Sequence, residues 1–163
     1  MRIHIGGDHA AYELQRALVA HLTESGHEVV DHGPTAYDAQ DDYPVYVLRA
    51  AEAVAADEGS LGVVLGGSGN GEQIAANKVR GVRAALAWSG ELAALAREHN
   101  NAQVVSIGAR FTSTEVAKEI VDTFVSTEFT DEARHSRRLG MVTAYENTGD
   151  LPALPESGEA DPD

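Results

Sequence analysis

A short glycine-rich segment holds the residues of this sequence that are best suited to chemistry. Four glycines, Ser68 and Glu72 fall between residues 66 and 72, after the apolar run Val63-Val64-Leu65 and before a helix-forming run. Glycine permits positive φ values and lets the backbone lie close to a ligand. A strand, a glycine loop and a helix start in this order direct several backbone N–H groups at one point, which suits an anion. Ser68 adds a hydroxyl group, and Glu72 adds a carboxylate beside the anion site.

The spacing within this loop excludes two common nucleotide-binding motifs. A P-loop needs Lys and then Ser or Thr after its last glycine, whereas Glu72-Gln73 stands there. A dinucleotide fingerprint read from Gly67 or Gly69 lacks its third glycine. Two interpretations remain. The loop holds a small oxyanion beside a carboxylate base, or it is a strand-to-helix turn that uses glycine only for its geometry.

A cluster of arginines near the end of the chain suits a phosphate group. Arg134, Arg137 and Arg138 stand at i, i+3 and i+4, so they share one helix face. Guanidinium groups bind phosphate oxygens bidentately. The chain has 12 Lys and Arg against 26 Asp and Glu, so three arginines in five residues favour an anionic ligand over the alternative, a solvated surface. Because this helix is the last, it can reach a neighbouring subunit rather than its own glycine loop.

Strands and helices alternate along the sequence. Strands are predicted at residues 3–5, 28–31, 61–65, 83–87 and 104–107, with Pro44 in the first turn of one helix and a last helix from about Asp131 to Tyr145. Asp8 is predicted to cap the first helix, and Thr112-Ser113-Thr114-Glu115 to form a capping box. This alternation predicts an α/β fold, a Rossmann-like three-layer αβα sandwich with a five-stranded parallel sheet.

Polar residues follow several of the predicted strands, and ligands bind at the carboxyl ends of parallel strands. Asp8 and His9 follow the first strand, Arg110 follows the fifth, and His99-Asn100-Asn101 end the helix between the fourth and fifth strands. Each has a plainer alternative: a helix cap for Asp8 and His99, a turn for Asn100, a surface charge for Arg110. Taken together they predict one site. Arginines for a phosphate and a carboxylate beside a backbone cradle point to metal-free aldose–ketose isomerisation of a phosphorylated sugar.

Composition limits the remaining possibilities. The 163 residues are enough for one domain, predicted over residues 1–148, and residues 149–163 carry five acids, no base and three prolines, which predicts a disordered tail. There is no Cys, so thiolate chemistry is excluded. The net charge of −14 disfavours nucleic acid as a partner. No apolar run approaches the roughly 20 residues of a membrane span, and the first strand leaves no room for a signal peptide, so a cytoplasmic protein is expected.

Five motifs in order resemble type B ribose-5-phosphate isomerase, and the likeness covers about residues 1–146. The motifs are Asp8-His9-Ala10-Ala11-Tyr12-Glu13, Asp42-Tyr43-Pro44, Gly67-Ser68-Gly69-Asn70-Gly71 with Ala75-Ala76-Asn77-Lys78, His99-Asn100-Asn101, and Arg134-His135-Ser136-Arg137-Arg138. The sequence is most similar to the actinobacterial branch, which carries Gly-Ser-Gly-Asn-Gly-Glu. The resemblance implies interconversion of ribose 5-phosphate and ribulose 5-phosphate through a cis-enediol, in the pentose phosphate pathway and without a cofactor.

The resemblance also implies roles for individual residues. Many family members have a Cys base just before the glycine loop; Gly66 stands there, so Glu72 would take the proton instead. His99 with Asp8 would open the sugar ring, and Ser68 with the amides of Gly69 to Gly71 would hold the oxyanion. The positions expected to bind the sugar or its phosphate are His9, Tyr43, Gly67, Gly69, Asn70, Gly71, Asn100, Arg110, Arg134, His135 and Arg138. The family site lies between two subunits, which implies a homodimer, or a tetramer, with shared sites.

Two other interpretations stay open at this point. The chain could isomerise another phosphorylated sugar, a tetrose or a hexose phosphate, with nearly the same site. It could instead be a non-catalytic module that binds a phosphorylated metabolite or a nucleotide. Glu72 speaks against the second alternative, because a carboxylate beside an anion cradle repels a ligand that is only bound.

Overall fold

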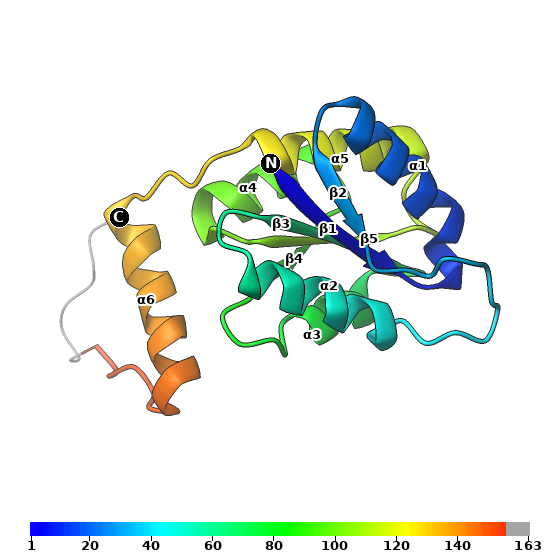
Figure 1. Ribbon diagram of the computed structural model, residues 1–163. Helices are drawn as coiled ribbons and strands as arrows, with labels where there is room; N and C mark the ends of the chain where they lie inside the picture. The colour runs from blue at the N-terminus through cyan, green and yellow to red at the C-terminus, as the bar shows by residue number, and fades with distance from the viewer. Residues whose placement is uncertain (156–163) are drawn as a thin grey trace. The chain divides into compact units, whose positions relative to one another are not determined.

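The computed structural model describes residues 1–155, which form two compact units (Figure 1). The first unit, Met1–Asp131, contains the whole sheet, and the second begins at Glu132. Residues 149–155 form neither helix nor strand and are exposed. The remainder of the predicted disordered tail, residues 156–163, lies outside the described residues.

A single parallel sheet of five strands organises the first unit, in the order β2-β1-β3-β5-β4 (Figure 1). This confirms the predicted fold class. The strands are β1 (Arg2–Gly7), β2 (Glu28–Asp31), β3 (Leu61–Gly66), β4 (Ala84–Leu86) and β5 (Val104–Gly108). Neighbouring strands end in step, because Gly7 pairs with Leu65 and Gly66 pairs with Gly108. The loops that leave β1, β3 and β5 therefore start side by side.

Helices cover both faces of the sheet (Figure 1). The helices α1, α4 and α5 lie on one face, and α2 and α3 lie on the other. The helical segments are η1 (His9–Ala11, a 3₁₀ turn), α1 (Tyr12–Glu24), α2 (Pro44–Ala56), α3 (Asn70–Ala76), α4 (Gly90–Asn100), α5 (Thr114–Ser126) and, in the second unit, α6 (Ala133–Thr148).

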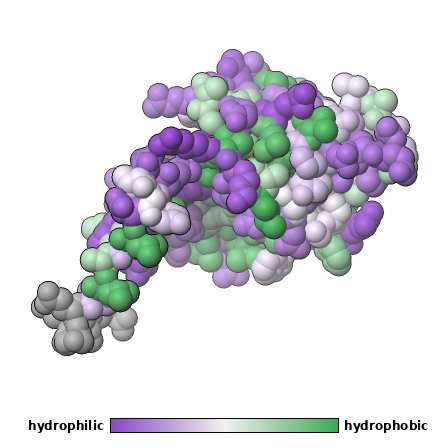
Figure 2. Space-filling view, turned by 90° about the horizontal axis from the view of Figure 1, so that it is seen from below, coloured by the Kyte–Doolittle hydropathy of each residue, from purple (hydrophilic) through white to green (hydrophobic). Residues whose placement is uncertain are grey.

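The central strand β3 shows how the sequence produces the three layers. All six of its residues are buried, as expected for a strand that is covered on both faces. Successive side chains of a strand point to opposite faces, so Val63 and Leu65 pack with α1, α4 and α5, whereas Val64 packs with α2 and α3. Figure 2 looks from below, toward the α2 and α3 layer, and shows hydrophobic residues scattered among hydrophilic ones there.

Two helix caps differ from the sequence prediction. The helix α5 is capped by Ser113, whose side chain accepts a hydrogen bond from the backbone N–H of Val116, so the predicted capping box is one residue out of register. Asp8 caps the short turn η1 rather than α1 itself, and its Oδ1 accepts from the N–H of Ala10 at 3.0 Å. Asp8 is a capping residue, as predicted, but a 3₁₀ turn lies between it and the α1 helix.

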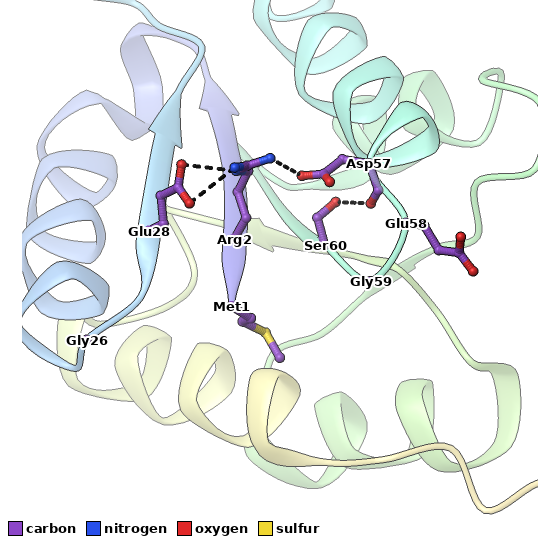
Figure 3. A pocket seen from close by; sticks show the side chains of 8 residues that line it. All are labelled: Met1, Arg2, Gly26, Glu28, Asp57, Glu58, Gly59 and Ser60. Carbon is purple, nitrogen blue, oxygen red and sulfur yellow. Dashed lines mark hydrogen bonds and ion pairs between the residues drawn. The ribbon is translucent and has the colours of Figure 1, made fainter.

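A hollow at the amino-terminal edge of the sheet is lined by residues that form ion pairs with one another (Figure 3). Arg2 stands between two carboxylates, with Nη1 at 2.9 Å from Asp57 Oδ2 and Nε at 3.1 Å from Glu28 Oε1. Glu58 lines the same hollow. One arginine among three carboxylates leaves a net negative charge, so this hollow does not suit an anion.

Candidate active site

The loops after β1 and β3 meet at the carboxyl edge of the sheet, where the strand order reverses. With residues after β5 and at the start of α2, they enclose a cavity of about 500 Å³. Its lining consists of Asp8, His9, Ala10, Tyr43, Gly67, Ser68, Gly71, Glu72, Arg110 and Phe111. All of these except Ala10 and Phe111 are site residues predicted from the sequence.

The conformation of the glycine loop depends on its lack of side chains. Gly69 has φ = +81° and stands at the start of α3, and a Cβ there would lie 2.5 Å from Leu86 Cδ1. A Cβ on Gly71 would lie 2.8 Å from Cζ of Tyr43, so the tyrosine ring packs directly on the loop. Ser68 Oγ accepts from the backbone N–H of Asn70 at 3.3 Å. The loop is thus fixed between Tyr43 on one side and Leu86 on the other.

Glu72 lies in the first turn of α3 and folds back beneath the loop. Its residue exposure is 3%, and its side chain fills the space beside Gly66 where a side chain would otherwise stand. Oε2 is buried without a hydrogen-bond partner among the described residues. Burial raises the pKa of Glu72, and the negative charge of Asp8 raises it further, while backbone amides of Glu72 and Gly69 oppose the rise. A buried carboxyl group with a raised pKa is well matched to proton transfer near neutral pH.

Two cationic groups share the cavity with the two carboxylates. The Arg110 guanidinium lies against the loop, because a Cβ on Gly67 would stand 3.4 Å from its Cζ. The His9 ring is held by Asp41 of the β2–α2 loop, with Nδ1 at 2.7 Å from Asp41 Oδ1. This hydrogen bond raises the pKa of His9, opposed by desolvation and aided by Asp8. The cavity therefore offers positive groups for an anionic ligand beside Glu72.

His99 and Asn100 do not join this cavity within one chain. They end α4 just before β5 begins at Val104, so they lie at the amino-terminal edge of the sheet. The carbonyl oxygen of Asn100 accepts from Nε of Arg83 there, at 2.9 Å. The four residue steps of β5 separate this edge from Gly108 by roughly 13 Å. A helix that precedes a parallel strand ends where that strand begins, at the edge opposite Asp8. Within a single chain, His99 and Asn100 therefore do not lie at the same edge of the sheet as Asp8, although the sequence predicted one site for all three.

The predicted phosphate-binding residues of the last helix belong to the second unit. Arg134, His135 and Arg138 lie on α6, where Arg134 Nε is 3.0 Å from Glu132 Oε2. Arg134 and Arg138 are one turn apart and exposed, and His135 is buried. All of the residues that line the carboxyl-edge cavity belong to the first unit.

The structure adds Asp41 to the residues that sequence reasoning identified. Asp41 lies in a loop with Asp38 and Asp42, and nothing in the spacing of the three distinguishes one from another. Only the fold brings Asp41 to His9 across 32 positions of sequence. Phe111, which is 79% exposed at the mouth of the cavity, likewise carries no signal in the sequence.

A parallel sheet with a buried carboxylate, an imidazole and a guanidinium at its topological switch point is typical of an α/β enzyme that acts on a small anionic ligand. A sequence model of the Ribose/Galactose Isomerase family matches residues 3–142. The chain belongs to this family, which confirms the relationship predicted from its motifs.

Individual relatives agree with that assignment. Ribose-5-phosphate isomerase B of Mycobacterium tuberculosis (strain H37Rv) is 54% identical over 155 residues, covering 95% of this chain and 96% of the relative. The enzyme of the same name from Escherichia coli K12 is 39% identical and covers 89% of this chain and 96% of the relative. The crystal structure of ribose-5-phosphate isomerase B from Mycoplasma genitalium with bound ribulose-5-phosphate superposes with a TM-score of 0.86 at 38% identity, covering 90% of this chain and 97% of that one.

Proposed function

We propose that this chain interconverts ribose 5-phosphate and ribulose 5-phosphate, with Glu72 as the base. The observation that carries the proposal is the buried Glu72 carboxyl group, with a raised pKa and an unpartnered Oε2, at the wall of a cavity that also holds His9 and Arg110. The relatives named above are ribose-5-phosphate isomerases, and each matches this chain over nearly its whole length. The activity predicted from the sequence is therefore consistent with both the site and the family.

The reaction uses these groups as follows. Glu72 takes the proton from C2 of the open-chain aldose, the C–H electron pair forms the C1–C2 double bond, and the carbonyl electrons move to O1. Ser68 and the amides of Gly69, Asn70 and Gly71 stabilise the enediolate. The proton then returns from Glu72 to C1, and the proton of the O2 hydroxyl is transferred to O1, which gives the ketose. Gly67 and Tyr43 line the sugar, and Arg110 and His9 hold its phosphate.

The direct test is turnover of ribose 5-phosphate by the full chain in heavy water containing EDTA, since a metal-free reaction is expected. NMR should show ribulose 5-phosphate and deuterium at C2 of the remaining aldose, because the proton passes through an exchangeable carboxyl group. The phosphates of allose, galactose and erythrulose are assayed alongside, and the kcat/KM values show whether the chain prefers ribose 5-phosphate over a hexose or tetrose phosphate. If no ketose formed and C2 of every aldose kept its hydrogen, the isomerase proposal would be wrong.

We also propose that the enzyme is a cytoplasmic homodimer, or a tetramer built from two such dimers, with active sites shared between subunits. His99 and Asn100 lie at the opposite edge of the sheet from Asp8, so a site that uses all three needs a second chain. The α6 residues Arg134, His135 and Arg138 are proposed to reach the phosphate across the same interface. No helix within residues 1–155 is long and apolar enough to cross a membrane.

Sharing of sites predicts that two inactive variants restore each other. Glu72→Gln and His99→Asn homodimers should each be nearly inactive, whereas their mixture should recover about a quarter of the sites, because half of the exchanged dimers contain one intact site. Activity is measured after subunit exchange has been verified by native mass spectrometry, with each variant mixed with itself as the control. Exchange without recovered activity would place Glu72 and His99 in sites that lie within one chain.

A further inference from the structure

A third carboxylate near the cavity, that of Asp41, contacts His9 twice. Its Oδ1 accepts from the backbone N–H of His9 at 2.9 Å and lies 2.7 Å from the ring nitrogen Nδ1. The Asp41 side chain is only 6% exposed, whereas that of His9 is 26% exposed. Asp41 Oδ2 is buried and has no hydrogen-bond partner among the described residues. The hydrogen bonds of this carboxylate are thus directed to a single residue.

Burying a carboxylate in this way is unfavourable unless a cation or donors compensate for the lost water. Asp38 of the same loop serves a local purpose, since it is exposed and its Oδ1 accepts from the N–H of Gln40 at 3.0 Å. Asp41 instead contacts a residue of the β1–α1 connection, which lines the cavity. A positive charge on His9 would compensate for the burial of the Asp41 carboxylate.

We propose that Asp41 is a positioning residue that holds His9 as an imidazolium, with Nε2–H free to meet the anionic end of the substrate. This rests on the proposed function, in which His9 contacts the phosphate. Asp41 occupies Nδ1, so Nε2 is the nitrogen that remains for a ligand. Tyr37 of the same loop packs edge-on against the His9 ring, with centroids 6.4 Å apart at 85°, and so restricts its rotation.

The electrostatic surroundings of His9 favour its charged form. The hydrogen bond that His9 donates to Asp41 is the main cause of the raised pKa of His9; desolvation opposes the rise, and the charge of Asp8 adds to it. The titratable groups that contact His9 or line the cavity with it are Asp8, Tyr37, Asp41, Tyr43, Glu72 and Arg110. An ordinary histidine loses its proton near pH 6.5, whereas a raised pKa extends the positive charge to higher pH.

The test is Asp41→Asn in the full chain, read out first on His9 itself. NMR titration of the labelled imidazole should show the pKa of His9 falling toward its ordinary value, without substrate or turnover. The KM for ribose 5-phosphate should rise about tenfold at about pH 8 with kcat little changed, and the ratio to wild type should shrink at about pH 6, where His9 is protonated in both proteins. Inorganic phosphate, as a simple anion probe, should raise the pKa of His9 more in wild type than in the variant.

Asp38→Asn is the matched control, because it removes the same charge from the same loop and should leave the pKa of His9 and KM unchanged. Asp41→Ser keeps an acceptor for the backbone N–H of His9 while removing the charge, and it replaces Asp41→Asn if that variant does not fold. In a His9→Asn background, Asp41→Asn should add nothing further to KM.

An unchanged pKa of His9 and an unchanged KM, in a folded variant with normal wild-type turnover, would overturn the role of Asp41 and leave the isomerase proposal intact. Loss of isomerase activity in the wild type would refute the proposed function instead. The titration of His9 in the free protein is independent of that outcome, so the two failures are distinguishable.

Discussion

Glu72→Gln is expected to lower kcat by at least about a hundredfold and to leave KM nearly unchanged. Glutamine has almost the same shape, so it can fill the space beside Gly66 and preserve the loop. It cannot accept the C2 proton, and this proton is transferred only in the transition state, which is why kcat falls rather than substrate affinity. Steady-state kinetics with ribose 5-phosphate measure the effect, and the rate of deuterium incorporation at C2 should fall in parallel.

The pH profile gives a second readout of the same group. Burial raises the pKa of Glu72, so the carboxylate form needed to accept the proton is lost as pH falls through a pKa above that of an ordinary glutamate. The acidic limb of kcat/KM in wild type should therefore lie above the usual glutamate range. Glu91→Gln is the control, because Glu91 is an exposed acid in the first turn of α4 and should leave both kcat and the profile unchanged. Near-normal turnover in Glu72→Gln would refute the assignment of the base.

Gly66→Ala is the second substitution for which we expect a large effect, although it adds only one methyl group. The new Cβ would overlap Oε1 and Cδ of Glu72 and stand 2.9 Å from its Cγ. The carboxyl group must then leave its buried position, so kcat should fall to a level similar to that of Glu72→Gln. Overpacking of a buried site also costs about 1–3 kcal/mol of the free energy of unfolding, which a thermal or urea denaturation measures.

A double variant separates this clash from a general effect of alanine in β3. In Gly66→Ala/Glu72→Ala the side chain that meets the new Cβ is gone, so stability should recover relative to Gly66→Ala while activity stays absent. Gly140→Ala is the control for an added methyl group without a clash, because no atom of the described residues lies within 4 Å of a Cβ there and the position lies in a helix. A fully active Gly66→Ala enzyme would show that Glu72 does not need its present position.

Local patterns were sufficient to predict most of the fold and the glycine loop. The apolar run Val63-Val64-Leu65 is typical of a strand covered on both faces, and Gly69 stands where a positive φ is needed. Asp8, His9 and Arg110 follow strand ends in the sequence, and parallel strands bring such ends to one edge. The cap of α5 was predicted one residue out of register, because Thr112, Ser113 and Thr114 are all suitable cap residues and only backbone geometry selects Ser113.

The sequence by itself determined that a carboxylate, a glycine cradle and cationic side chains occur at the ends of parallel strands, since these features depend on residue type and on short spacing. Only the tertiary structure decided that Asp41, rather than Asp38 or Asp42, contacts His9, and that Glu72 occupies the space beside Gly66. It also decided that His99 lies at the far edge of the sheet from Asp8. The Asp41–His9 contact and the position of His99 follow from strand order and loop path between segments distant along the chain, and the position of Glu72 follows from the backbone path of the glycine loop. Residue spacing does not encode these paths.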